Sequence, residues 1–85
     1  MDHVSRVVSA FITSQLMHDS SLQLEPDRRL LEEGIVDSLG LQQLVSFLET
    51  EFGVVVDDEH LLPENFETLD AITALVTDLA SRKSR

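Results

Sequence analysis

Cysteine, tryptophan and tyrosine are absent from the 85-residue chain, which also contains only 3 glycines and 2 prolines. Without cysteine, the polypeptide can form no disulfide, no thiolate metal site and no thiol nucleophile of its own. No hydrophobic run approaches the ~18 residues that a membrane-spanning helix needs. The first residues also lack the basic and hydrophobic regions of a signal peptide. These absences predict a cytoplasmic protein that does not enter a membrane.

Positive charge is also scarce. The chain has 6 lysines and arginines against 16 aspartates and glutamates, which gives a net charge of −10. An acidic surface of this kind repels phosphate backbones and anionic lipid headgroups. The charge balance therefore argues against binding to nucleic acid or to a membrane, and it favours protein partners with basic patches.

Length and hydrophobic periodicity together predict a single all-α domain. A chain of 85 residues makes one small domain, 1–85, with no room for a second. Hydrophobic residues recur at helical spacing in three long segments, and a shorter segment begins at an acidic capping position and ends before Pro63. The expected fold is a small four-helix bundle of three main helices and one short helix. The expected helices span residues 2–17, 38–52, 58–62 and 69–81.

Capping residues mark the ends of these helices. Asp2 and Thr68 are suitable N-caps for the first and last helices, and Gly53 is a typical C-cap for the helix over 38–52. The run Val54-Val55-Val56 finds no β-strand partner elsewhere in the chain. It is expected to be an extended connector that buries alternate side chains.

The segment 19–37 lacks a sustained period, so a long loop is expected between the first two main helices. Its hydrophobic residues predict that the loop packs along the core; they are Leu22, Leu24, Leu30, Leu31, Ile35 and Val36. The tail 81–85 is polar and basic, and it is expected to fray.

Motifs of an independent enzyme or a metal centre are missing. His3, His18 and His60 do not pair with one another at metal-ligand spacing. The cluster Asp57-Asp58-Glu59-His60 lacks the alternating ligands and central glycine of a calcium loop, and we interpret it as a capped, acidic helix start. There is no glycine-rich phosphate loop and no nucleophile elbow, and so small a core leaves little room for a substrate pocket. We expect a monomeric protein that is not an enzyme and holds no metal.

Ser38 is the residue best placed for chemistry. It begins the best-defined helix, where a serine is usually only an N-cap. The first turn of a helix also offers free N–H groups and the positive end of the helix dipole, which favour a bound or attached phosphate. The neighbouring Asp37 is placed to help hold the cation that a phosphoryl-type transfer requires.

A wider pattern surrounds this serine. The stretch Gly34-Ile35-Val36-Asp37-Ser38-Leu39 is followed by Leu44-Val45, Leu48-Glu49 and Glu51-Phe52-Gly53. This combination resembles the acyl carrier protein family, which includes peptidyl and aryl carrier proteins. The order of the expected helices also matches, so the resemblance covers residues 4–80, roughly. It implies that Ser38 is both a helix-start residue and an attachment point.

The resemblance implies a cofactor and a set of partners. A phosphopantetheinyl transferase, using coenzyme A and Mg²⁺, would attach 4′-phosphopantetheine to the Ser38 hydroxyl, and Asp37 would orient this enzyme and its metal. The thiol at the end of the arm would carry an acyl, aminoacyl or peptidyl group as a thioester. An acyl- or aminoacyl-activating ligase would load that group, and acyl-transfer or condensing enzymes would receive it.

Partner recognition is expected on the outer face of the helix over 38–52 and on the short helix after it. The resemblance assigns Leu39 as the hydrophobic contact beside the arm. The other expected recognition residues are Gln42, Gln43, Ser46, Glu49, Asp58, Glu59 and Leu61. Gly40 and the two glutamines depart from the acidic recognition helix of bacterial fatty-acid carriers, which favours hydrogen-bonded or apolar docking over electrostatic docking.

The pathway is left open by these residues. The segment from Leu62 to Leu69 resembles freestanding carriers that work with an AMP-forming ligase. We therefore expect a stand-alone carrier of a specialised pathway, of polyketide, nonribosomal peptide or aminoacyl type. One alternative is a housekeeping carrier of fatty-acid synthesis. An alternative of another class is a helical adaptor that binds a partner without any prosthetic group.

Overall fold

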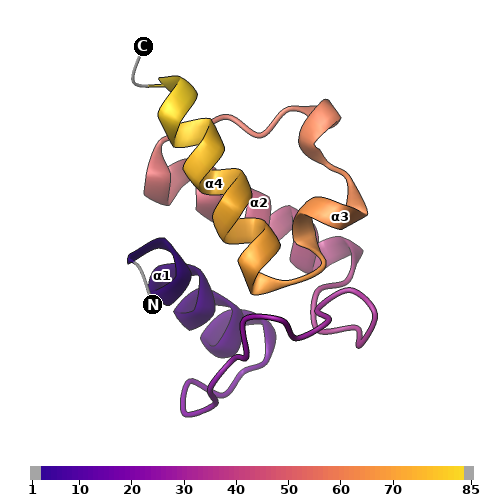
Figure 1. Ribbon diagram of the computed structural model, residues 1–85. Helices are drawn as coiled ribbons and strands as arrows, with labels where there is room; N and C mark the ends of the chain where they lie inside the picture. Colours follow the sequence, from indigo (N-terminus) through magenta and orange to yellow (C-terminus); the bar gives the residue numbers. More distant parts are fainter. Residues whose placement is uncertain (1–2, 84–85) are drawn as a thin grey trace.

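An all-helical fold is seen in the computed structural model, which describes residues 3–83 and has no strand among them. The main helices are α1 (His3–Phe11), α2 (Ser38–Phe52) and α4 (Leu69–Lys83), and the short helix α3 (Pro63–Phe66) precedes α4. Helix α4 crosses the front of the molecule in Figure 1 and contacts the other three helices. The predicted bundle of three main helices and one short helix is confirmed.

The core lies between the hydrophobic faces that the helical periodicity predicts. Leu44 and Leu48 of α2 and Ile72 of α4 are 0% exposed, and Phe66 of α3 is 1% exposed. Burying a side chain of this size stabilises a fold by about 1.5–3 kcal/mol. The same cluster extends to α1 and to the loops. Its other buried members are Val8, Ile12, Leu24, Leu30, Val36, Val54, Val56, Leu69, Leu75, Val76 and Leu79.

The first helix is less regular than the predicted segment 2–17. Its α-helical part gives way to one wide π-helical turn over Ile12–Leu16. The hydroxyls of Thr13 and Ser14 donate to backbone carbonyls one turn earlier, and such side-chain bonds compete with the regular helical ladder. Asp2, the predicted N-cap, lies outside the described residues.

The chain after α2 also differs from its prediction. In place of one helix over 58–62 that stops at Pro63, a 3₁₀ turn spans Asp58–His60 and α3 begins at Pro63. Proline suits the first position of a helix because its fixed φ is helical and its missing N–H is not needed there. The connector Val54–Val56 is extended, with Val55 67% exposed and both neighbours buried, so the predicted alternation is confirmed.

The last helix begins as predicted and ends later than predicted. Thr68 accepts a hydrogen bond from a first-turn N–H of α4 at 3.1 Å, which confirms it as the N-cap. The helix continues to Lys83, two residues beyond its predicted end, and the rest of the tail that is predicted to fray lies outside the described residues. Arg82 pairs with Asp78 one turn earlier at 3.1 Å, and a basic residue near a helix C-terminus is favourable to the helix dipole.

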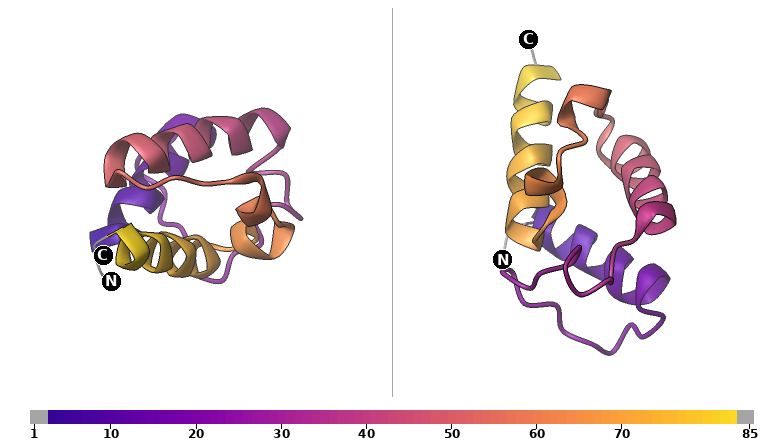
Figure 2. Two further views of the ribbon diagram at one scale, coloured as in Figure 1. Left: turned by 90° about the horizontal axis from the view of Figure 1, so that it is seen from above. Right: turned by 90° about the vertical axis from the view of Figure 1, so that its right-hand side faces the viewer.

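The loop between α1 and α2 leads the chain to the start of α2. Leu24, Leu30 and Val36 are buried as predicted, whereas Leu22 is 42% exposed because it closes a surface turn, which corrects its predicted packing. The Leu30 N–H donates to the Glu67 carbonyl at 2.8 Å, and this bond fixes the loop beside the start of α4. Figure 2 shows the loop passing below α1 in the right-hand view and rising into α2.

Candidate functional site

The start of α2 is capped by Asp37 and not by Ser38. Asp37 has an extended backbone, with φ −97° and ψ −170°, and its Oδ1 atom accepts a hydrogen bond from the Gly40 N–H at 2.7 Å. Its carbonyl accepts the Leu41 N–H, also at 2.7 Å. Ser38 is therefore the first helical residue, as predicted, and the capping role that a serine often has at a helix start is taken by Asp37. A carboxylate takes that role here, and it suits the positive end of the helix dipole.

This arrangement leaves the Ser38 hydroxyl free. Ser38 is exposed, and its side chain forms no hydrogen bond with any residue in the described range 3–83. Leu39 beside it is 64% exposed. The hydroxyl lies at the positive end of the α2 dipole, where first-turn N–H groups can stabilise a phosphate ester. The site thus offers an accessible oxygen in surroundings that suit a phosphate.

Gly40 makes room for the cap. It is buried, and a Cβ atom at this position would lie 3.1 Å from Asp37 Oδ1 and 3.5 Å from Leu16 Cδ2. The first of these distances is tighter than an ordinary van der Waals contact, so a larger residue would press on the capping carboxylate. A glycine inside a helix costs up to ~1 kcal/mol relative to alanine. The close approach of Asp37 accounts for a glycine at this place.

An apolar pocket of about 310 Å³ opens beside Ser38. The buried Phe66 lines it, together with Leu61 and Leu62, which are 40% and 45% exposed. Ser38 itself lines the pocket, and the remaining lining residues are Leu31, Val36, Asp37, Leu41 and Pro63. Leu61 is the predicted recognition residue found here. The pocket can shelter an apolar part of a group attached to the serine.

A larger groove of about 750 Å³ runs between α1 and α2. We call it the α1–α2 groove, and its lining residues are Phe11, Gln15, His18, Leu39, Gln42, Gln43, Ser46, Phe47 and Thr50. Four of the lining residues from α2 are predicted recognition residues, and the structure brings them to one surface: Leu39, Gln42, Gln43 and Ser46. The residues from α1 and from the turn after it were not predicted, because the periodicity of one helix does not reveal which neighbour its edge meets.

The remaining predicted recognition residues lie elsewhere. Glu49 is half-buried, and its Oε2 atom accepts a hydrogen bond from the Val56 N–H at 2.9 Å. Its carboxylate therefore holds the extended connector against α2. Asp58 and Glu59 are exposed on the 3₁₀ turn. Neither residue lines the pocket beside Ser38 or the α1–α2 groove.

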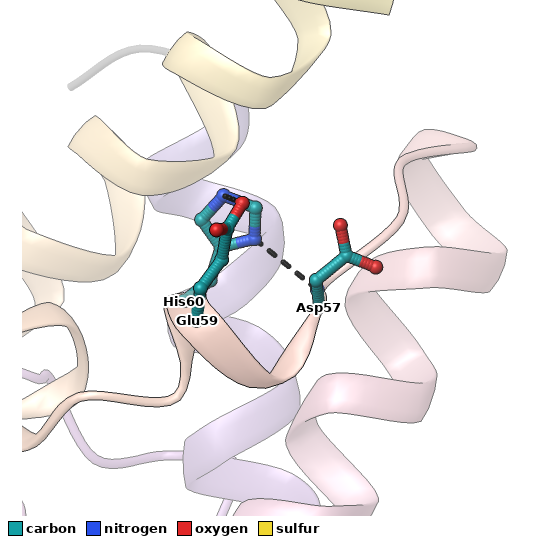
Figure 3. A group of neighbouring side chains, drawn as sticks. All are labelled: Asp57, Glu59 and His60. Atoms are coloured by element: carbon teal, nitrogen blue, oxygen red, sulfur yellow. Dashed lines mark hydrogen bonds and ion pairs between the residues drawn. The ribbon is translucent and has the colours of Figure 1, made fainter.

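The acidic turn is held by its own histidine (Figure 3). His60 Nδ1 accepts a hydrogen bond from the Asp57 N–H at 3.1 Å, and Glu59 Oε1 lies 3.8 Å from His60 Nε2. Oxygen and nitrogen atoms of these three side chains lie within 4.8 Å of one another. However, Nδ1 is already engaged, and Arg82 lines the adjoining pocket. We assign the cluster to capping the turn.

Two displaced pKa values belong to the loop before α2. Hydrogen bonds from the Ser21 hydroxyl and N–H lower the pKa of the Asp19 carboxyl group. The Glu32 carboxylate accepts a hydrogen bond from Arg29 at 2.9 Å and raises the pKa of the Arg29 guanidinium group. Both groups are exposed and form local turns of the loop, so these shifts describe the loop and supply no acid–base chemistry to Ser38.

A helical bundle that presents a free serine hydroxyl at the start of its second main helix has the architecture of a carrier domain. Residues 8–76 match the family model described as "Phosphopantetheine attachment site", and the chain belongs to this family. Over 68 residues it is 34% identical to the "Probable acyl carrier protein PigG" of Serratia sp. (strain ATCC 39006), a match that covers 80% of this chain and 78% of that protein.

Solved structures agree with this assignment. The structure described as "Structure of KstB-PCP(apo)" superposes with a TM-score of 0.73 and 33% identity, covering 92% of this chain and 86% of that one. A chain in "Crystal structure of FAD-dependent dehydrogenase" superposes with a TM-score of 0.75 and 32% identity, covering 81% of this chain and 97% of that one. The chain is thus similar in both sequence and fold to peptidyl and acyl carriers.

Membership of the family settles the class of function. The protein is an acyl or peptidyl carrier with a covalently attached 4′-phosphopantetheine, and it works with a phosphopantetheinyl transferase and with biosynthetic enzymes. The alternative of an adaptor without a prosthetic group is therefore set aside. Carriers of this class are generally not catalysts themselves. Within residues 3–83, no helix has the length and hydrophobicity to cross a membrane.

Substitutions of Asp37 can distinguish its role as the N-cap of α2 from its predicted contact with the transferase and with the metal ion of that enzyme. Asp37→Ala should lower the free energy of unfolding by about 0.5–2 kcal/mol. Asp37→Asn and Asp37→Ser should keep most of the stabilisation that the cap provides, because both residues cap helices well. Urea unfolding of the three variants measures this order. If the charge also serves the cation, the Asn and Ser variants will be modified more slowly although they are folded. Equal stability of the Ala variant and the wild type would contradict the cap.

Proposed function

We propose that the 4′-phosphopantetheine is attached to Ser38 Oγ and that its thiol carries an acyl or aminoacyl group as a thioester. The observation that carries this proposal is the free, exposed hydroxyl at the first residue of α2. The Ser38 oxygen attacks the phosphorus atom of coenzyme A that bears the pantetheine. The bond from that phosphorus to adenosine 3′,5′-bisphosphate breaks, and the hydroxyl proton passes to a base of the transferase.

The neighbouring residues support this assignment. The Asp37 cap fixes the backbone of the first turn of α2, and with it the point from which the Ser38 side chain leaves the helix. The N-terminal end of α2 stabilises the charge of the phosphodiester. The apolar pocket lined by Leu61, Leu62 and Phe66 gives the first part of the arm a surface to lie on. The cofactor itself supplies the thiol that the cysteine-free chain lacks.

A specialised biosynthetic pathway suits this carrier better than fatty-acid synthesis. The exposed residues Gln42, Gln43 and Ser46 leave the outer face of α2 uncharged beside Ser38, whereas carriers of bacterial fatty-acid synthesis use acidic residues there. The similarity to a peptidyl carrier points the same way. In this pathway an AMP-forming ligase would load the arm, and acyl-transfer or condensing enzymes would receive the group. The housekeeping role is the second candidate.

A small cargo suits the packing of the bundle. Leu44 and Leu48 of α2 pack in the same cluster as Ile72 of α4, and all three are 0% exposed. A long acyl chain would need space inside this cluster, and opening a packed core is costly. An aminoacyl group or a short acyl group can remain outside, near the 310 Å³ pocket. We therefore favour an aminoacyl or short acyl group over a long acyl chain as the carried group.

The test is the intact mass of the chain before and after incubation with coenzyme A, Mg²⁺ and a broad-specificity phosphopantetheinyl transferase. The expected result is the gain of one phosphopantetheine group, and no gain by the folded protein would overturn the proposal. The modified chain is then offered to AMP-forming ligases with a panel of amino acids and fatty acids. Because one similar chain comes from a structure described as an FAD-dependent dehydrogenase, loaded carrier is also treated with such an enzyme. Loss of a pair of hydrogen atoms from the loaded group would identify that partner class.

A further inference from the structure

We infer that Leu16, in the π-helical turn at the end of α1, is a positioning residue for the modification of Ser38. Its side chain lies against Gly40 and holds the first turn of α2 in place while the serine hydroxyl reacts. This inference rests on the proposed attachment at Ser38. It gives a part in the reaction to a residue of another helix, which is neither the attachment residue nor one of the predicted recognition residues.

The first argument is the contact between Leu16 and Gly40. A Cβ atom at Gly40 would lie 3.5 Å from Leu16 Cδ2 and 3.7 Å from Leu16 Cδ1, so both methyl groups of the leucine face the place where a side chain would begin. Gly40 also donates its N–H to Asp37 Oδ1 at 2.7 Å. The buried glycine is therefore held both by the cap and by the leucine.

The second argument is that the buried stripe of α2 begins with a glycine. Its buried residues are Gly40, Leu44 and Leu48, each one helical turn after the last. Leu44 and Leu48 anchor the later turns with side chains that are 0% exposed, whereas Gly40 has no side chain to bury. Glycine also leaves the backbone its greatest conformational freedom. Leu16 thus supplies the hydrophobic contact that the first turn of α2 lacks on this stripe.

The third argument is the irregular helix that carries Leu16. The π-helical turn spans Ile12–Leu16, and the Met17 N–H donates to the Ile12 carbonyl at 2.9 Å. A turn that holds an extra residue rotates the side chains at its end by up to about 100° relative to a regular α-helix. Such turns occur frequently at functional sites. Here the wide turn ends at the leucine that meets Gly40.

The end of α1 supports the start of α2 without occupying the surfaces around Ser38. In the right-hand view of Figure 2 it lies just below the start of α2, and a hollow of about 260 Å³ joins Leu16 to Asp37 and Gly40. This hollow shares only Asp37 with the pocket beside Ser38. Leu16 does not line the α1–α2 groove either. Truncation of Leu16 therefore leaves the residues of both surfaces in place.

The position of the first turn matters because the reaction is a displacement at phosphorus. The attacking oxygen must approach roughly in line with the bond that breaks. No residue in the described range 3–83 forms a hydrogen bond with the Ser38 side chain, so the backbone of the first turn determines where the oxygen starts. A misplacement of about 1 Å can cost roughly 100-fold in rate. A residue that steadies this turn therefore acts on the rate of transfer.

The experiment measures kcat and KM of modification separately, with coenzyme A, Mg²⁺ and a broad-specificity transferase. The chains compared are the wild type, Leu16→Ala, Leu16→Met and Val4→Ala. Val4 is the matched control because it is another half-buried hydrophobic residue of α1 and lines neither the pocket beside Ser38, nor the α1–α2 groove, nor the 260 Å³ hollow. Exchange of the Gly40 and Leu48 N–H groups with water is measured by NMR on the unmodified chains. Melting temperatures are recorded by circular dichroism, and Leu16→Val takes the place of Leu16→Ala if the latter is not folded at the assay temperature.

The expected results separate positioning from docking and from stability. Leu16→Ala should lower kcat by about tenfold, while its KM stays within about twofold of the wild type because the recognition surface is intact. Exchange of the Gly40 N–H should rise by about tenfold and that of Leu48 should not change, since only the first turn is loosened. Leu16→Met should restore most of kcat because methionine keeps the volume of leucine. Val4→Ala should keep the kcat of the wild type.

Three results would overturn the positioning role. One is a folded Leu16→Ala variant with the kcat and the Gly40 exchange of the wild type. Another is a higher KM at constant kcat, which would make Leu16 a docking contact. The third is an equal fall of kcat in Val4→Ala, which would assign the effect to lost stability. Failure to modify the wild type would instead remove the proposed attachment, and the two failures are distinguishable because Gly40 exchange is measured without modification.

Discussion

Ser38→Ala should leave the protein folded with nearly unchanged stability and should abolish its modification by the transferase. The hydroxyl makes no hydrogen bond with residues 3–83, and the cap of α2 belongs to Asp37. Alanine is also at least as favourable as serine inside a helix. We therefore expect Ser38→Ala to remove the modification without lowering the free energy of unfolding. Intact mass after incubation with coenzyme A and the transferase, together with a urea unfolding curve, measures both.

Ser46→Ala is the matched control for this experiment, because Ser46 is also an exposed serine of α2. At the end point of the reaction it should gain one phosphopantetheine group, as the wild type does, even if its rate is lower. Modification of Ser38→Ala would assign the attachment to another residue. A large loss of stability in Ser38→Ala would instead mean that the hydroxyl supports the fold, contrary to the geometry described above.

Helix α2 is the element that could be predicted to the residue, because both of its ends carry unambiguous signals. The Asp-Ser pair marks the start, and Gly53 marks the end by adopting the left-handed conformation, with φ 64°. The π-helical turn after α1 could not be predicted in this way, since it depends on which carbonyl each hydroxyl side chain selects. Sequence alone does not decide the role of Pro63, because a proline can stop one helix or start the next.

The candidate site likewise has features that the sequence could predict and features that it could not. A local motif identified Ser38, Asp37 and Leu39, and the structure places all three at one helix start. A local motif could not decide which of Asp37 and Ser38 forms the cap, because both residue types are good caps and the choice depends on backbone geometry. Phe11 and His18 could not be found either. They join the groove only through the contact between two helices, which no short stretch of sequence encodes.

The second large effect is expected from Phe66→Ala. Phe66 is the largest fully buried side chain and is 1% exposed, although it lies on a helix of only 4 residues. So short a helix has little stability of its own, so the ring is what holds α3 against α4. Removing a buried phenylalanine side chain costs about 3–5 kcal/mol, the lost transfer energy plus the cavity left behind. A domain of this size has a total stability of roughly 4–13 kcal/mol.

Phe66→Ala therefore removes a large share of the stability and also opens the pocket beside Ser38, which the ring lines. Urea unfolding should show the loss, and modification by the transferase should slow at temperatures where the wild type is fully folded. Leu61→Ala is the matched control: Leu61 lines the same pocket but is 40% exposed, so its truncation should cost less than about 1.5 kcal/mol. Equal losses for the two variants would mean that α3 is held by contacts other than the buried ring. A stable Phe66→Ala that is modified slowly would instead assign the ring to the shape of the pocket, and would show that α3 keeps its place without it.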